Sequence, residues 1–207
     1  QAGVRQFIQI SALGADVESG SSYARSKAQG AAAVREIFPQ AVILRPGVVF
    51  GPEDDFFNRF AAMVPFSPAL PLIGGGRTRF QPVYVCDVAA AVARVVGDRS
   101  WAGRTFELGG PRIYSFRELM ETLLTVIRRK RLLVPVPFWL AGAMAAAIEL
   151  ALYLPALIVP AFVPAPPLTR DQVRLLRQDN VVADGADGFA ALEIETTGLE
   201  AILPTYL

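Results

Sequence analysis

The sequence predicts an α/β fold in which a doubly wound parallel sheet is followed by a small, mostly helical lobe. Residues 6–10 and 41–44 are short apolar runs of the kind that form buried parallel strands. The segment 23–38 between them is rich in alanine, has no internal proline and is followed by Pro39, as expected for a helix. Strand, helix and strand in this order form one unit of such a sheet.

The rest of the chain continues with short strands and helices. We predict strands over 80–85 and 104–108, and helices over 54–64, 88–96, 115–128 and 170–178. Phe56, Phe57, Phe60 and Met63 recur at helical spacing and are expected in the core. Three residues are expected at helix starts, namely Asp87, Ser115 with a capping box to Glu118, and Thr169. Gly74-Gly75-Gly76 lacks a following Lys-Ser or Lys-Thr and is expected to be a flexible turn.

Composition excludes several function classes. The 207 residues carry 20 Lys and Arg against 19 Asp and Glu, and the net charge of +1 gives no reason to expect nucleic-acid binding. The chain has no histidine, which removes Ser-His and Cys-His catalysis and the commonest zinc ligand, and we expect no metal. Its single cysteine, Cys86, cannot form an internal disulfide.

Ser11, Tyr23 and Lys27 are the residues best suited to chemistry. Tyr23 and Lys27 are four apart near a helix start and share one helix face, and we expect the ammonium group to lower the pKa of the phenol. Ser11 follows the first strand, at the carboxyl end where open α/β sheets bind ligands. Pro46-Gly47 follows the second strand and would let a ligand approach the backbone closely. The alternative is a half-exposed aromatic ring, a solvated charge and an ordinary turn.

Residues 128–163 form the most unusual stretch. Arg128-Arg129-Lys130-Arg131 precedes an apolar segment, 132–163, whose only charge is Glu149. Four prolines divide this segment, so we expect an apolar helix over 138–154 and a Pro-rich loop in place of a membrane span. A basic cluster beside an exposed apolar helix suits contact with an anionic membrane surface or a membrane protein, and a helix buried in its own lobe fits as well.

Motifs from one end of the chain to the other occur in a characteristic order. They are Ser11, Tyr23-Ala-Arg-Ser-Lys27, Arg45-Pro46-Gly47-x-x-Phe50-Gly51-Pro52 and Val83-Tyr84-Val85-x-Asp87-Val88. This order resembles the extended and atypical short-chain dehydrogenase/reductases, the NAD-dependent epimerase/dehydratase superfamily. Segments 51–63, 81–88 and 168–173 are similar to the alpha-subcomplex subunit 9 family, the NAD(P)H-binding accessory subunits of respiratory complex I.

The resemblance implies a fold, a domain division and a role for each motif. Residues 1–111 would be the C-terminal half of a Rossmann-like NAD(P)-binding domain with a substrate-lobe insert at about 53–80, and 112–207 a helical substrate or docking lobe. Tyr23 and Lys27 would hold the nicotinamide ribose hydroxyls, Ser11 would face the ring or substrate, and Pro46 and Gly47 would line the nicotinamide pocket. In a catalytic member the set Ser11, Tyr23 and Lys27 would be catalytic, with Tyr23 as acid/base.

Two departures from the family pattern change what is expected. Gln29 and Ala31 replace acidic residues on a helix surface, which weakens the resemblance slightly. No G-x-G-x-x-G turn follows a strand, so the phosphate-binding half is not in this sequence. We therefore expect a native chain with roughly a hundred further residues upstream of Gln1, and only weak NADPH binding by the fragment alone.

The resemblance leaves two functions open. The first is a non-catalytic, structural or regulatory NAD(P)H-binding subunit of complex I, peripheral on the cytoplasmic face of a bacterial inner membrane, with NADP(H) expected in preference to NAD(H). Its partners would be complex I subunits, with membrane-surface contact through 128–163. The second is a soluble NAD(P)-dependent epimerase, dehydratase or reductase acting on a nucleotide sugar or small carbonyl compound, in which Arg77 or Arg79 would grip the substrate diphosphate.

Overall fold

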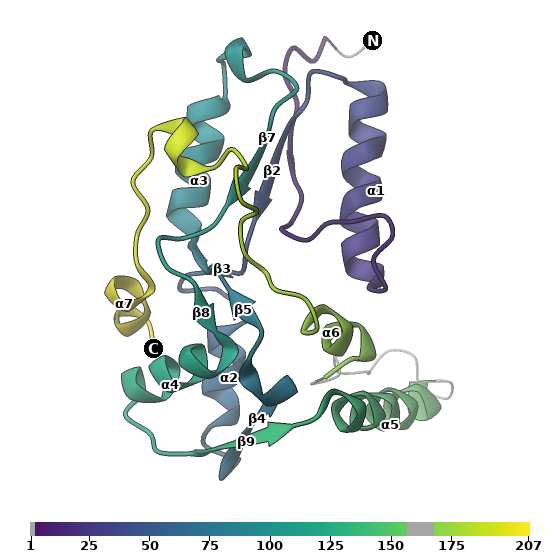
Figure 1. Cartoon of the computed structure of the whole chain (residues 1–207), viewed down its shortest axis with the longest axis vertical. Coiled ribbons are helices and arrows are strands. Elements are labelled where there is room, and N and C mark those ends of the chain that lie inside the picture. Colours follow the sequence, from purple (N-terminus) through teal and green to yellow (C-terminus); the bar gives the residue numbers. More distant parts are fainter. Residues whose placement is uncertain (1–2, 157–167) are drawn as a thin grey trace.

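The computed structural model describes residues 3–156 and 168–207 (Figure 1). Strands are labelled β, α-helices α and 3-10 helices η. The elements in chain order are β1 (Ile8–Ile10), α1 (Ser22–Ile37), β2 (Val42–Pro46), β3 (Val49–Phe50), α2 (Phe57–Met63), β4 (Ala69–Ile73), η1 (Gly74–Gly76), β5 (Arg79–Phe80), β6 (Val83–Tyr84), α3 (Val85–Val95), η2 (Arg99–Trp101), β7 (Thr105–Leu108), β8 (Tyr114–Ser115), α4 (Phe116–Val126), β9 (Leu132–Val136), α5 (Phe138–Ala156), α6 (Arg170–Leu175), η3 (Phe189–Leu192), α7 (Leu199–Ile202) and η4 (Leu203–Thr205).

A three-stranded parallel sheet in the order β1-β2-β7 forms the upper half of the molecule in Figure 1. Alternate side chains of β2 face opposite sides, so Val42 and Leu44 join the cluster that includes α3, while Ile43 packs with Ala31 of α1. Helix α1 therefore covers one face and α3 the other. This arrangement confirms the predicted doubly wound parallel sheet.

Helix α1 begins and ends within one residue of its prediction. Ser21 has extended backbone angles, and its side chain accepts a hydrogen bond from the Ala24 N–H, as an N-cap residue does. The face toward the sheet carries Ala24, Ala28 and Ala31, whose small side chains let the helix lie close to the strands. The predicted capping box of Ser115 at α4 is also present, and Thr169 caps α6 as predicted, in a capping box with Gln172.

The lower half contains a core rich in aromatic rings. Phe56 contacts Phe57, Phe60 and Phe116 with ring centroids 5.0, 5.3 and 6.2 Å apart, all in edge-to-face geometry. These contacts confirm the predicted core role of the phenylalanines in 54–64. Helix α2 begins at Phe57, three residues later than predicted. Asp54 lies before the helix, and its carboxylate accepts the Phe57 N–H of the first turn at 2.5 Å.

Two predictions around residues 80–96 are wrong in detail. The single strand expected over 80–85 is two, since Pro82 has no N–H and the chain passes from an antiparallel pair with β8 to a parallel pair with β3. Asp87 is not the N-cap of the next helix, because α3 already begins at Val85. The Asp87 carboxylate instead accepts the N–H and the hydroxyl of Thr197, at 2.6 and 3.0 Å.

The apolar stretch after residue 131 contains a strand that the sequence reading missed. β9 pairs with β4 in a parallel two-stranded sheet, and each strand contains a proline. Proline is tolerated there because each strand has only one neighbour. Helix α5 follows from Phe138 as predicted and continues to Ala156; residues 157–163 lie outside the described residues. Among the residues described, no helix has both the length and the apolar character needed to cross a bilayer.

The C-terminal segment returns over both halves of the molecule. Phe189 and Leu192 of η3 pack against the sheet and α3, and the Glu107 N–H donates to the Asp187 carbonyl at 2.8 Å. Near the chain end, the Tyr206 hydroxyl donates to Asp54 Oδ2 at 2.5 Å. Burial and the Asp54 acceptor both raise the pKa of Tyr206, so the phenol stays protonated and keeps this bond.

Replacing Tyr206 with phenylalanine should lower the free energy of unfolding by about 1–2 kcal/mol, because Asp54 loses a partly buried donor. Urea unfolding monitored by circular dichroism measures the change. Tyr23→Phe at a tyrosine that is 47% exposed is the control and should leave stability nearly unchanged. Equal stability of Tyr206→Phe and the parent would mean that this bond contributes nothing.

Candidate functional site

Two loops leave the carboxyl ends of β1 and β2 side by side. The Leu13 N–H donates to the Pro46 carbonyl at 2.9 Å, which continues the parallel pairing beyond β1. Gly47, directly after β2, donates its N–H to the Leu108 carbonyl at 2.9 Å. Ser11 follows β1 at the same edge, which is the edge where open α/β sheets bind ligands.

Ser11 joins this edge to helix α1. It is 3% exposed, and its hydroxyl donates to the Lys27 carbonyl oxygen at 3.2 Å. The hydroxyl therefore fixes the position of the helix turn that carries Lys27. The role expected for Ser11 toward a nicotinamide ring or substrate stays a prediction.

Tyr23 and Lys27 lie together in the first two turns of α1. The Lys27 ammonium lies over the Tyr23 ring, 5.6 Å from its centroid, in a cation–π arrangement. Burial raises the pKa of Tyr23, and no hydrogen bond joins the two side chains among the described residues. The expected lowering of this pKa is therefore wrong for this geometry, and at neutral pH the phenol is a proton donor.

Asp171 of α6 completes the N-terminus of α1, although it lies 150 positions beyond Ser21 in the sequence. Its carboxylate accepts the Ser21 hydroxyl at 2.8 Å, the Ser22 N–H at 2.8 Å and the Tyr23 N–H at 3.1 Å. Burial alone would raise the pKa of Asp171, but these hydrogen bonds outweigh it and hold the pKa below its ordinary value. A negative charge at a helix N-terminus is also favoured by the helix dipole.

The backbone at Gly47 passes close to the backbone of Gln81. A Cβ atom added there would lie 2.7 Å from the Gln81 carbonyl oxygen and 3.3 Å from Asn180 Oδ1. That Asn180 oxygen is buried without a hydrogen-bond partner among the described residues. The loop after β2 therefore requires a glycine because the Gln81 backbone occupies this space. Close approach of a ligand to this loop stays a prediction.

Gly47→Ala should lower the free energy of unfolding by about 1–3 kcal/mol, since the Gln81 backbone must move to admit the methyl group. Gly30→Ala is the matched control, because a Cβ there meets nothing within 4 Å in the middle of α1. That control should instead be stabilising by about 0.5–1 kcal/mol. Thermal denaturation of both variants measures the signs, and a stabilising Gly47→Ala would contradict the close backbone approach described.

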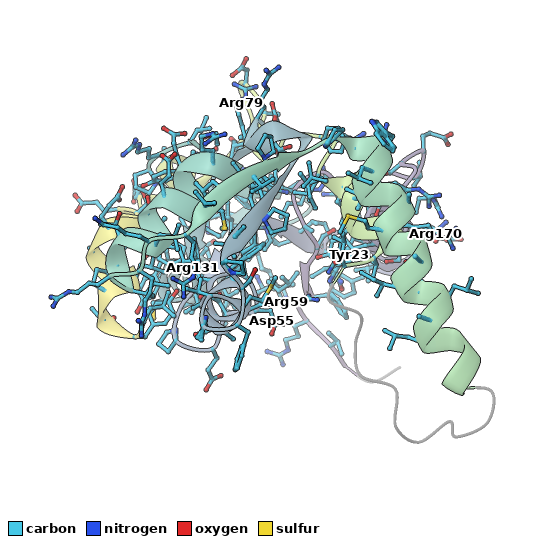
Figure 2. The ribbon with its side chains drawn as sticks, turned by 90° about the horizontal axis from the view of Figure 1, so that it is seen from below. Tyr23, Asp55, Arg59, Arg79, Arg131 and Arg170 are labelled. Atoms are coloured by element: carbon cyan, nitrogen blue, oxygen red, sulfur yellow. The ribbon has the colours of Figure 1, made fainter. Side chains whose placement is uncertain are left out.

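The Arg79 backbone adjoins this edge, since the Asn180 N–H donates to the Arg79 carbonyl at 2.8 Å, but the Arg79 side chain is engaged elsewhere. The Arg79 side chain pairs with Asp179, Nε to Oδ2 at 2.8 Å, and Figure 2 shows Arg79 and Tyr23 on separate parts of the molecule. Arg77 and Arg79 both line an open depression beside η1 together with Arg117 of α4. Their predicted grip on a diphosphate stays a prediction, now at a place separate from Tyr23.

Three residues at the edge were missed by the sequence reading. The Gln81 amide donates to the Gly110 carbonyl at 2.8 Å and accepts the Val182 N–H at 3.1 Å. The Asn180 amide donates to the Leu13 carbonyl at 3.4 Å, and Asp171 caps α1. Asp171 lay inside a segment that resembled the subunit family, which could have drawn attention to it. Nothing local in the sequence marks Asn180.

Comparison with known proteins identifies the family. The model of the NAD dependent epimerase/dehydratase family matches residues 3–109. The chain belongs to this family. Its relatives include the mitochondrial NADH dehydrogenase [ubiquinone] 1 alpha subcomplex subunit 9 of Arabidopsis thaliana, 42% identical over 93% of this chain and 47% of the relative, and that of Mus musculus, 33% identical over 97% and 50%. The chain thus spans about half the length of these curated relatives.

Solved structures share the epimerase/dehydratase fold. The crystal structure of gox2253 matches 98% of this chain and 65% of its own, with a TM-score of 0.62 and 18% identity. The UDP-glucose 4-epimerase of Thermus thermophilus, in complex with NAD, matches 65% of this chain and 52% of its own, with a TM-score of 0.51 and 21% identity. These matches confirm the Rossmann-like α/β fold.

The residues at the sheet edge fit the nicotinamide-ribose end of an NAD(P) cofactor. A protonated Tyr23 and the Lys27 ammonium are donors suited to ribose hydroxyls. The 207 residues contain no glycine-rich turn after a strand that could hold the pyrophosphate. Binding of the cofactor by Tyr23, Lys27, Pro46 and Gly47 stays a prediction.

Proposed function

We propose that this chain is part of an NAD(P)H-binding accessory subunit of respiratory complex I, with a structural or regulatory role. The observation that carries the proposal is the 42% identity to the Arabidopsis subunit over 93% of the chain. The family model ends at residue 109, so this identity extends far into the second half of the chain. If this chain and the Arabidopsis subunit dock on the same kind of partner through the second half, that half should be similar in both proteins, as it is.

The raised pKa of Tyr23 disfavours a role as general base, while the protonated phenol can donate either a hydrogen bond to a cofactor or a proton to a substrate. A general base near neutral pH needs a lowered pKa, whereas burial raises the pKa of Tyr23. The protonated phenol and the Lys27 ammonium are proposed to donate hydrogen bonds to the ribose hydroxyls. Ser11 and the Pro46-Gly47 loop are proposed to border the ring. A bound nicotinamide would supply hydride-transfer chemistry, which this role does not use.

The cofactor is proposed to be NADP(H) in preference to NAD(H). The test uses the full-length protein that contains this chain, purified without added nucleotide and then denatured to release what it holds. Enzymatic cycling assays specific for each nucleotide should find about one NADP(H) per chain. Absence of any nicotinamide nucleotide would overturn the binding role, and recovery of NAD(H) alone would overturn the preference.

We also propose peripheral contact of residues 128–163 with the cytoplasmic face of a bacterial inner membrane. Among the described residues of this stretch, Leu132 is 71% and Trp139 is 73% exposed, and Arg128-Arg129-Lys130-Arg131 lies directly before them. Exposed apolar side chains beside a basic cluster favour an anionic lipid surface. Residues 157–163 are outside the described part of the chain.

Sedimentation with lipid vesicles tests this contact. The protein should bind vesicles that contain phosphatidylglycerol and release them at high salt, and Trp139→Ala should weaken binding about five- to tenfold. Trp101→Ala is unsuitable as a control because Trp101 packs on Phe106. Leu150→Ala at another exposed position of α5 serves instead and should have a smaller effect. Equal binding to neutral and anionic vesicles would contradict the proposal.

A second candidate is an NAD(P)-dependent epimerase, dehydratase or reductase acting on a nucleotide sugar or a small carbonyl compound. It is favoured by the meeting of Ser11, Tyr23 and Lys27 at one edge. In that case Tyr23→Phe should abolish turnover while cofactor remains bound. For the accessory subunit, the same variant should leave respiratory NADH oxidation unchanged.

A further inference from the structure

The lower half of the molecule contains an apolar cavity of about 390 Å³ that the nucleotide-binding role does not use. Its walls come from α2, β4, α4, α5 and α6, and include Phe60, Phe116, Met144, Ile148 and Leu175. Figure 2, seen from below, draws helix α5 and labels Arg59; α5 and Arg59 both contribute to the lining of this cavity. Its volume is within the range of ligand pockets, roughly 300–1,000 Å³.

Both walls of the cavity are held in place by contacts within the fold. Phe60 and Phe116 have ring centroids 5.6 Å apart, and both contact Phe56, so one wall is a network of interlocked rings. The opposite wall is α5, which is held to α6 by a bond from the Arg170 N–H to Glu149 Oε1 at 2.8 Å. Protein cores are close-packed, so a rigid apolar space this large is expected to be filled by a ligand.

The lining selects a hydrocarbon ligand. Arg59 and Gln172 are the only polar side chains among the described residues that line the cavity. The Gln172 amide is already engaged, since its Oε1 accepts the Thr169 N–H at 3.1 Å in the capping box of α6. A sugar or nucleotide would lose its hydrogen bonds to water here without replacement. An unbranched acyl chain has no such hydrogen bonds to lose.

An entry route lies along α5. Met144 lines the cavity and is 45% exposed, and Leu140 one turn earlier is 37% exposed. The apolar surface of α5 is therefore continuous with the cavity interior at Met144. The acyl chain of a ligand could therefore enter the cavity from a lipid surface, or from solution, without crossing polar groups.

The cavity is distinct from the nucleotide edge. Tyr23, Lys27 and Ser11 do not line it, and α6 separates the two, with Asp171 bonded to α1 and Gln172 facing the cavity. We propose that this cavity binds the single long acyl chain of an amphiphile. The site is a binding site without chemistry, and the proposal does not depend on the association with complex I.

Fluorescence titration with cis-parinaric acid, followed by displacement with palmitate, tests the proposal on the purified protein. Saturable binding is expected with a Kd below about 10 µM. Ile148→Trp fills the cavity and should weaken binding at least about tenfold. Leu150→Trp, two positions further along α5 and 60% exposed, is the matched control and should bind within about twofold of the parent.

Two further measurements keep the result decisive if Ile148→Trp folds poorly. Met144→Trp at the partly exposed mouth should also weaken binding at least about tenfold, with an unchanged circular dichroism spectrum. Octanoate should displace the probe much less readily than palmitate, because its shorter chain fills less of the cavity. Absence of saturable binding by the parent, displacement of the probe by octanoate as readily as by palmitate, or unaltered binding by both tryptophan variants would overturn the proposal.

Discussion

Lys27→Met should remove most of the nicotinamide nucleotide that the full-length protein retains on purification. The ammonium group lies over the Tyr23 ring at the N-terminal end of α1, where it can reach a ribose hydroxyl beside the sheet edge. A hydrogen bond from a charged donor contributes about 1.5–3 kcal/mol, which corresponds to roughly 10- to 150-fold in affinity. Isothermal titration with the reduced nucleotide after its removal from the protein measures the loss.

Lys130→Met is the matched control, because Lys130 is the other lysine of the chain and lies beyond α4 in the basic cluster. It should retain the nucleotide at the parent level. Tyr23→Phe removes a neutral donor and should weaken binding less, by about three- to tenfold. Equal affinity of Lys27→Met and the parent would exclude Tyr23 and Lys27 as the cofactor clamp.

Asp171→Ala should lower the free energy of unfolding by about 1–2 kcal/mol. Its carboxylate accepts three hydrogen bonds at the start of α1, from Ser21, Ser22 and Tyr23. The exposed Ser22 and Tyr23 N–H groups turn to water in the variant, while the partly buried Ser21 hydroxyl loses its acceptor. Asp184→Ala, at an exposed aspartate, is the control and should change stability by less than about 0.5 kcal/mol. Urea denaturation at neutral pH compares the two.

The contribution of the Asp171 charge should depend on pH with a definite sign. Hydrogen bonding holds the pKa of Asp171 in the folded protein below its ordinary value of 3.8. The stabilisation is therefore complete above the unfolded pKa and is lost as the pH falls through the lower folded pKa. The stability difference between the parent and Asp171→Asn should stay constant above about pH 5 and shrink below about pH 4. A difference that grows on acidification would contradict this assignment.

Local patterns account for the elements that were predicted well. The start of α1 follows from the capping side chain of Ser21 and its end from the nearby Pro39, and the capping boxes of α4 and α6 are local in the same sense. The central strand β2 was predicted because burial on both faces leaves a continuous apolar run. The edge that carries Ser11 and Gly47 followed from these elements, since carboxyl ends of parallel strands share one edge.

Contacts between distant segments account for what was missed. β4 and β9 each contain a proline and are strands only because they pair with each other across the lobe. Asp87 looks like a helix cap in isolation, but its partner Thr197 lies 110 positions away. The pKa of Tyr23 depends on how its ring is buried, which a motif of five residues does not encode.

The domain division at residues 111 and 112 stays a prediction. The first half of the chain contains the sheet, and most of the second half surrounds the aromatic core. Residues 187–194 nevertheless pack on the sheet and α3. Limited proteolysis in the segment between Leu108 and Tyr114 would report whether the two parts separate as units.

Membership of complex I is the central claim, and native electrophoresis of detergent-solubilised membranes tests it most directly. Membranes from the source cell would be separated, and peptides of this chain located by mass spectrometry in each band. We predict that the peptides co-migrate with the large NADH dehydrogenase and its core subunits. Peptides found only in a small species that is free of those subunits would contradict the proposal, and would return Tyr23 to the role of an acid/base in a separate enzyme.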